Sequence, residues 1–160
     1  MATQNNIGKT LYIADELPTT NDKTGFEALS WVQVKGVQVL PQLGVTGANI
    51  DVPDLQSGFT AGVKGAMSGN ESTATFRRVD NDPGQEDVEE IANSPEGLCS
   101  IKIVRGSGTN QAPMPGDPVQ YAQGYMNAYL EIQGDTTTHE GFTVTFKQND
   151  FTVNDVEPGT

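Results

Sequence analysis

The sequence is poor in cysteine, histidine and basic residues, and each shortage excludes a class of protein. Cys99 is the single cysteine and His139 the single histidine of 160 residues, which excludes an internal disulfide framework and a cysteine-based zinc site. Lys and Arg number 9 against 21 Asp and Glu, a formal net charge of −12. Because affinity for nucleic acid phosphates comes from Lys and Arg, this balance argues against a protein that holds nucleic acid.

Long apolar runs are also missing. No segment approaches the roughly 20 apolar residues of a membrane-spanning helix. Residues 1–9 are polar and no apolar core follows them, so we expect no signal peptide. What is abundant is glycine (18) and proline (9), which is typical of a β-rich chain with many turns. The length favours a single domain over residues 1–160, with flexible ends at 1–8 and 155–160.

The clearest pattern lies between Tyr121 and Gln133, where two residue sets alternate. Because strand side chains point alternately to opposite faces, this predicts a strand with one small or apolar face and one polar, tyrosine-bearing face. The tyrosines would also align on a helix, but Gly124 and the period of two favour the strand. The apolar set is Ala122, Gly124, Met126, Ala128, Leu130 and Ile132; the polar set is Tyr121, Gln123, Tyr125, Asn127, Tyr129, Glu131 and Gln133.

A second strand is expected after the turn-like run at 135–138. Phe142, Val144 and Phe146 alternate with Thr143, Thr145 and Lys147, and the apolar residues then change parity to Phe151 and Val153. A strand that keeps one face buried changes parity only by inserting a residue, so we predict a bulge within Lys147–Asp150.

The rest of the chain also has mainly β patterns. One short helix is expected around Val88–Ala92, because acidic residues precede it and Val88, Ile91 and Ala92 form an apolar stripe. Residues 53–69 are predicted to form an arm or long hairpin, and a segment of this kind in a compact domain usually has a function. The fold class is therefore mainly β, a two-sheet sandwich or barrel flanked by one short α-helix. Further strands are expected at Thr10–Ala14, Trp31–Lys35, Val37–Leu40, Gly44–Asp51, Glu71–Val79 and Ile101–Arg105, with Trp31 as a core anchor and loops at Asp15–Gly25 and Gly106–Pro118.

No segment of the sequence matches a motif for catalysis or cofactor binding in full. Ile7–Thr10 ends like a phosphate-binding loop, but position 3 is Thr instead of the required Gly. The acids at 80, 82, 86 and 87 lack the spacing of a calcium loop and are better explained as a solvated helix start. His139 has no nucleophile partner, and Cys99 is best explained as a buried, inert thiol. We therefore expect no enzyme activity, no metal and no cofactor.

The order of these elements resembles the major tail tube protein of long-tailed (siphovirus-type) phages and of gene-transfer particles. The elements that carry the resemblance are a first strand, a Trp-headed strand, an Asp/Gly-rich arm from Asn49–Leu55 to Gly69, the strand Ser72–Phe76, a helix opened by Pro83–Gln85, the strand Ile101–Ile103 and the closing strand Phe142–Phe146. The resemblance covers roughly Lys9 to Asn154.

The resemblance implies a structural virion protein of the phage tail, made in the host cytoplasm. Its subunits would form stacked hexameric rings, with sheets joining between subunits into a lumen-lining β-barrel and the helix outside. Its partners would be further copies of itself, a tape-measure protein, the tail terminator and distal tail proteins. DNA would pass through during ejection without specific binding, since an acidic, Asn/Gln/Thr-rich lining repels it weakly.

The resemblance also implies which residues would act. The candidates for the lumen lining are Gln123, Asn127, Glu131, Gln133, Thr143 and Thr145. The candidates for the arm that reaches a neighbouring ring are Asp51, Asp54, Phe59, Lys64 and Met67.

Two other readings of the sequence remain open. The first is a monomeric β-sandwich that binds a glycan or a protein, for which Tyr121, Tyr125 and Tyr129 would supply the aromatic platform. The second is the tube of a contractile tail or secretion system. For the lining face itself, the alternatives are a solvated outer face or a face covered by the helix, and the tyrosines could instead pack between subunits.

Overall fold

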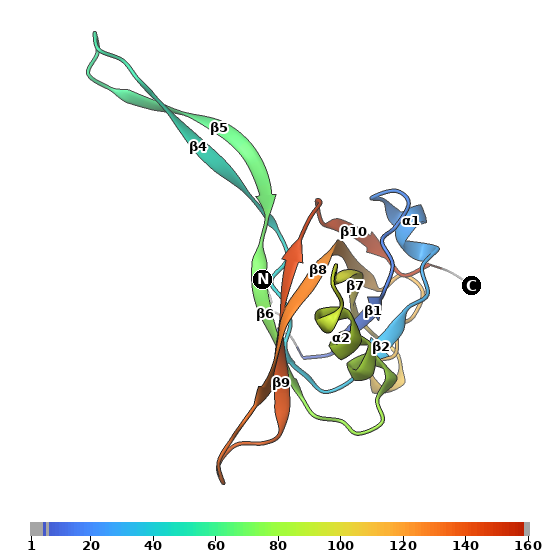
Figure 1. Cartoon of the computed structure of the whole chain (residues 1–160). Helices are drawn as coiled ribbons and strands as arrows, with labels where there is room; N and C mark the ends of the chain where they lie inside the picture. The colour runs from blue at the N-terminus through green and yellow to red at the C-terminus, as the bar shows by residue number, and fades with distance from the viewer. Residues whose placement is uncertain (1–4, 6, 159–160) are drawn as a thin grey trace.

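The computed structural model describes residue 5 and residues 7–158, and it is mainly β with two sheets (Figure 1). The larger sheet has the strand order β2-β1-β7-β8-β9-β6-β3, and β10 also pairs with β8. The smaller sheet is a hairpin of β4 and β5 that projects away from the body. The strands are β1 (Lys9–Ala14), β2 (Val32–Val34), β3 (Val37–Val39), β4 (Val45–Pro53), β5 (Thr60–Gly69), β6 (Glu71–Arg77), β7 (Leu98–Arg105), β8 (Pro118–Ile132), β9 (Gly141–Gln148) and β10 (Val153–Val156); the helices are α1 (Lys23–Glu27), α2 (Pro83–Asn93) and the 3-10 turn η1 (Thr109–Gln111).

The main core lies between one face of the large sheet and α2. The apolar stripe of α2, formed by Val88, Ile91 and Ala92, packs on this face. Strand β9 contributes its alternate residues Phe142, Val144 and Phe146, which are all buried. The expected mainly β fold with a short helix on one face is therefore confirmed. No helix among the described residues is long and apolar enough to span a membrane.

The N-terminus of α2 joins the two ends of the large sheet. Strands β2 and β3 lie at opposite ends of the strand order, yet only Lys35 and Gly36 separate them in the chain. Gln85 Nε2 donates to the carbonyls of Lys35 and Arg77, both at 2.7 Å, and Gln85 Oε1 accepts from Val79 N at 3.0 Å. The Asp82 side chain caps α2 through Gln85 N and also accepts from Lys35 N at 3.0 Å. Asp82 and Gln85, which are both buried, thus hydrogen-bond backbone groups of the segments that flank β2, β3 and β6. These groups have no strand partner there, because β2 and β3 do not pair with each other.

A second, smaller core lies on the opposite face of the sheet, under α1 and β10. Its buried members are Phe26, Val104, Val119 and Tyr121, and the Phe26 and Tyr121 rings stack with centroids 5.0 Å apart. Trp31 packs against this cluster and donates its indole N–H to Phe26 O at 3.0 Å. Trp31 is thus half-buried next to the second core, and β2 starts one residue after it.

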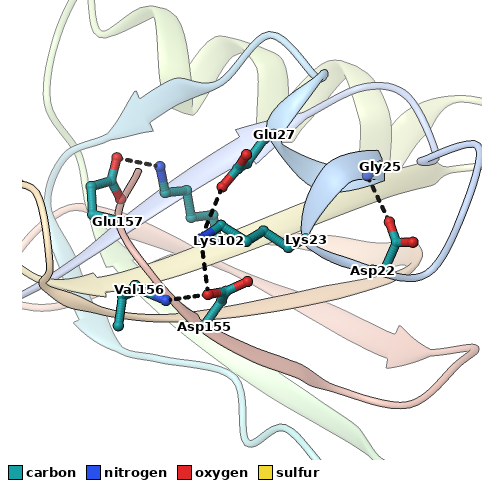
Figure 2. Close-up of polar contacts among 8 residues, drawn as sticks. All are labelled: Asp22, Lys23, Gly25, Glu27, Lys102, Asp155, Val156 and Glu157. Carbon is teal, nitrogen blue, oxygen red and sulfur yellow. Dashed lines mark hydrogen bonds and ion pairs between the residues drawn. The ribbon is translucent and has the colours of Figure 1, made fainter. Parts of the chain in front are cut away.

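The C-terminal segment is fastened over this second core by charged side chains (Figure 2). Lys102 on β7 is only 7% exposed, and its Nζ lies 3.0 Å from Glu157 Oε1. Lys23 of α1 contacts Asp155 of β10 at 3.3 Å, nearer the surface. Strand β10 pairs with β8, with Val153 opposite Tyr121 and Val156 opposite Pro118. Asp155 and Val156, expected in a flexible end, therefore lie in a strand; the expected flexible residues 1–4, 6, 159 and 160 lie outside the described residues.

Strand β8 departs from the predicted strict alternation at Ala128. This residue has a left-handed backbone (φ 56°), and the β8–β9 register shifts between Asn127 and Leu130. A bulge inserts one residue, so every side chain after it changes face. Tyr129 consequently packs on the main core, while Leu130 of the predicted apolar set is 62% exposed.

The predicted bulge at Lys147–Asp150 is instead a wider break between β9 and β10. Gln148 pairs with Gly124 and Val153 pairs with Tyr121, so four residues of one strand oppose two of the other. Val153 does reach the second core, but Phe151 is exposed. The expected loop at Asp15–Gly25 also contains the start of α1, which Asp22 caps by accepting from Gly25 N at 2.8 Å.

Candidate interaction surfaces

The β4–β5 hairpin has two chemically different faces, and both are exposed in the single chain. Register pairs place Ile50 opposite Val63 and Val52 opposite Ala61. Phe59 lies two residues before Ala61 and therefore on the same face, and its C=O accepts from Asp54 N at 3.1 Å. The other face carries Asn49 opposite Lys64 and Asp51 opposite Gly62. We call the first face the apolar stripe; its members are Ala48, Ile50, Val52, Phe59, Ala61 and Val63.

The apolar stripe is largely in solvent. Phe59 is 72% exposed, and Ile50, Val52 and Val63 are each about half exposed. At the turn Leu55 is fully exposed, and Gly58, which adopts a left-handed backbone (φ 69°), donates its N–H to Asp54 O. A two-stranded hairpin is marginally stable in water without a covering surface, so the stripe is a candidate interaction surface.

The arm candidates from the sequence fall on different parts of this hairpin. Phe59 belongs to the apolar stripe and Asp54 to the turn, whereas Asp51 and Lys64 lie on the polar face. Met67 lies beyond a register shift at Ala48, on the same side as Lys64. The sequence reasoning missed Ile50, Val52 and Val63. The signal was the alternation of Ile50 and Val52 with Asp51, and of Ala61 and Val63 with Gly62.

The second surface is the face of the large sheet that lies opposite the main core. Over β6, β9 and the end of β8, no described helix or strand covers this face. Register places Thr73 opposite Thr145, Thr75 opposite Thr143, and Asn127 opposite Thr145 from the other side. We call this the threonine face. Three of the lining candidates, Asn127, Thr143 and Thr145, come together on it.

The other lining candidates lie elsewhere. Gln123 shares the face of β8 but is half-buried at its covered end, where it donates to Asn21 Oδ1 at 2.9 Å. The bulge at Ala128 turns Glu131 to the opposite face, where it sits across from Phe142 and contacts Arg78 at 3.4 Å. Gln133 follows the end of β8 and is exposed. The expectation that Glu131 shares a face with Thr143 is therefore wrong.

The threonine face carries little net charge. Its ionic residues are Glu71 and Lys147, which lie opposite each other on β6 and β9, and Arg77, which lies opposite Gly141 at the other end of β6. Lys147 also donates to Ser68 Oγ at the base of the hairpin. The acidic residues concentrate instead on and beside α2, where desolvation, followed by the nearby Asp15 and Glu90 charges, raises the pKa of Asp87. An acidic lining was expected, but the described threonine face carries one acidic and two basic residues.

The three tyrosines do not form a binding platform. Tyr121 is 1% exposed in the second core, and burial raises its pKa above the ordinary value. Tyr129 packs against Phe142 on the opposite side of the sheet, with ring centroids 5.0 Å apart. Tyr125 alone remains half-buried on the threonine face. A glycan platform of three aromatic rings is therefore not present in this fold.

Cys99 and His139, which the sequence analysis considered for catalysis, do not lie in a catalytic arrangement. Cys99 is fully buried, and desolvation raises the pKa of its thiol to about 12. His139 lies 2.6 Å from the side-chain nitrogen of Gln38 in an exposed position. Across residue 5 and residues 7–158, no three His, Cys, Asp or Glu side chains are grouped to hold a metal ion.

Several strand edges remain unpaired in the described part of the chain. The outer edges of β4 and β5 have no partner strand there, and neither does the outer edge of β10. Strand β7 pairs with β8 only as far as Tyr125, so the segment Asn127–Ile132 has β9 on one side and no strand on the other. Open edges are templates for pairing with another chain.

Solved structures of injection particles share this fold. A chain from the sheath and tube terminator of an extracellular contractile injection system (PVC, extended state) has a TM-score of 0.64 at 12% identity, covering 98% of this chain and 99% of its own. A chain from the sheath–tube complex of that system has a TM-score of 0.60 at 10% identity, covering 93% and 88%. A chain from the baseplate of the anti-feeding prophage has a TM-score of 0.63 at 7% identity, covering 98% of each.

No protein-family model matches the sequence, and no curated protein matches it. At these low identities the similarity concerns the fold. The chain thus shares its fold, over nearly its whole length, with chains of phage-tail-like tube, terminator and baseplate assemblies. The first two of these chains come from a contractile injection system, whereas the resemblance in the sequence was to long-tailed phages.

Proposed function

We propose that this chain is the structural subunit of a phage-tail-like tube, in which hexameric rings stack along an axis. The coverage of nearly the whole chain by chains of injection particles supports this proposal. The particle would be a virion tail or a related particle, assembled after synthesis in a host cytoplasm. Its other components would be a tape-measure protein, a terminator and distal proteins. A long-tailed phage remains our first proposal, and a contractile particle is the alternative that the solved structures favour.

The observation that carries the proposal is the projecting hairpin with its uncovered apolar stripe (Figure 1). Burying apolar surface contributes about 25 cal/mol per Å². Phe59 is 72% exposed and Ile50, Val52 and Val63 are about half exposed, so covering this stripe would stabilise the chain. Packing it against another copy buries it without any change in the body. A head-to-tail contact of this kind repeats without limit when the rotation does not close, which is how rings stack into a tube.

The threonine face is our proposed lining of the bore. Hydroxyl and amide side chains at Thr73, Thr75, Thr143, Thr145 and Asn127 stay hydrated without fixed charge. Duplex DNA carries one negative charge per roughly 1.7 Å of axis, and a wall rich in Lys and Arg would grip it. We propose that DNA passes through this bore because the hydroxyl and amide groups of the wall bind it only weakly. This replaces the explanation from composition, in which an acidic wall repels the DNA.

Negative-stain microscopy and size-exclusion chromatography at rising protein concentration test the proposal. We expect rings or tubes of uniform diameter, and a Val63→Asp variant should remain monomeric because it places a charge in the apolar stripe. Asn49→Asp adds the same charge to the polar face and serves as the matched control. Persistent monomers of the unmodified chain at high concentration would overturn the proposal, as would tubes of Val63→Asp identical to the control.

A further inference from the structure

The tip of the hairpin combines exposed apolar side chains with negative charge. Leu55 is fully exposed and Phe59 is 72% exposed, and Asp54 stands between them and β4. The Asp54 carboxylate accepts from Gln56 N at 3.0 Å, and hydrogen bonds from Ser57 and Gln56 lower its pKa. The tip therefore presents two apolar side chains beside a carboxylate that is ionised at neutral pH.

A groove of about 480 Å³ lies on the body, between the β3 region and the ends of β1, β7 and β8. Val39, which is 51% exposed, Leu40 and Ile103 supply its apolar surface. Gln120 and neighbouring glutamines supply its polar rim, and Lys9 is the one charged residue that lines it. Strand β3, which pairs on one side with β6, borders this groove.

We propose that the hairpin tip of one copy seats in this groove of a second copy, with Leu55 and Phe59 against Val39 and Leu40 and with Asp54 facing Lys9. The inference rests on the proposed tube function and names the contact that stacks its subunits. The two surfaces are opposite in charge. The Asp54 carboxylate lies at the tip beside Leu55, and the Lys9 ammonium is the one ionic group among the described residues that line the groove.

The occupant must come from another copy. Strand β4 runs for nine residues from its base at Val45, so the tip stands about 30 Å from the body of its own chain. The groove lies near the base of the same hairpin, because residues 40–43 line it and β4 begins at Val45. A copy displaced by the length of the hairpin would offer its groove to the tip. Repeating this contact gives an axial spacing between rings of roughly 30–40 Å.

Paired cysteines test the contact in the full chain. Leu55→Cys and Val39→Cys both replace exposed side chains, and the native Cys99 is fully buried. Under mild oxidation the double variant should form a ladder of covalent oligomers on denaturing gels. A mixture of the two single variants should give dimers, and each single variant alone should give only monomers.

The outcomes separate this inference from the proposed function. A ladder supports the contact. Tubes seen by microscopy without a ladder overturn the contact and leave the tube standing. Monomers with neither tubes nor ladder overturn both.

Charge reversal gives a second, independent test. Lys9→Glu or Asp54→Lys alone should raise the concentration needed for tube formation about fivefold, and the double reversal should restore it. Lys35→Glu changes an exposed lysine outside the groove lining and should leave assembly unchanged. Equal effects of Lys9→Glu and Lys35→Glu, or failure of the double reversal to restore assembly, would contradict the proposed contact.

Discussion

Glu157→Gln is expected to destabilise the second core by removing the carboxylate that neutralises a buried lysine. The Lys102 side chain is 9% exposed and the Glu157 side chain 16% exposed, with 3.0 Å between Nζ and Oε1 (Figure 2). Glutamine keeps the size and one acceptor oxygen but not the charge. Lys102 would then remain buried beside the rings of Tyr12 and Tyr121, whose centroids lie 5.3 and 6.0 Å from its Nζ.

The expected loss in the free energy of unfolding is about 3 kcal/mol, the lower end of the range for breaking a buried ion pair. The lower end applies because the two ring contacts and the glutamine oxygen still stabilise the ammonium. The matched control is Asp155→Asn. Its partner Lys23 lies at 3.3 Å, but that side chain is 42% exposed, so the loss should stay below about 1 kcal/mol.

Urea unfolding followed by Trp31 fluorescence measures both variants. Trp31 is the only tryptophan and packs against the second core, 5.8 Å from the ring of Tyr121. With a slope of about 2–3 kcal/mol per molar urea, the midpoint for Glu157→Gln should fall by roughly 1 M. Far-UV circular dichroism recorded in parallel shows whether β10 detaches before the rest unfolds. A midpoint shift no larger than that of Asp155→Asn would refute the reasoning.

Three further outcomes are expected. Gln85→Ala should cost about 3 kcal/mol in thermal or urea unfolding, because it removes a buried side chain that bonds three part-buried backbone groups; a loss below about 1 kcal/mol would contradict the closing role. Because Cys99 is buried and desolvation raises the pKa of its thiol to about 12, the folded chain holds almost no reactive thiolate at pH 8, so alkylation should require unfolding and proceed no faster than the chain unfolds; rapid labelling of the folded chain would show that the thiol is accessible. Ala128→Gly should stabilise the chain by about 0.5–1 kcal/mol, since alanine is strained at φ 56°, whereas a loss of stability would show that the left-handed bulge is not strained.

Most of the strands and helix α2 could be predicted because each depends on a local period. Phe142, Val144 and Phe146 alternate with polar residues and are all buried, as the pattern indicated. The helix expected around Val88–Ala92 lies within α2, which begins earlier, at Pro83, where the buried Asp82 caps it. Helix α1 was missed because five residues without an apolar stripe resemble a turn, and it is held by burial of Phe26 in the second core.

The side of the sheet on which a residue lies could not be predicted for the part of β8 that follows the bulge. The alternation from Tyr121 to Gln133 is unbroken in the sequence, yet the inserted residue at Ala128 reverses its second half. Burial of Tyr129 against Phe142, with Arg78 donating to the Tyr129 hydroxyl at 3.1 Å, is a long-range gain that the local pattern does not contain. The reversal exposes Leu130 and removes Glu131 from the threonine face. The lining candidates were therefore only partly brought together.

The body and the hairpin of this chain differ in what stabilises them: the body is stabilised by its own contacts, and the hairpin, in our proposal, needs a second copy. Gln85 and Asp82 satisfy the backbone where the two ends of the large sheet meet, so the body is stable without a partner at that corner. The hairpin has no comparable cover on its apolar stripe or on its two outer edges among the described residues. Since a free apolar hairpin gains stability only on contact, its folding and its assembly depend on the same surface. A body that folds alone and a hairpin completed by a second copy would keep subunits soluble until they add to a growing end.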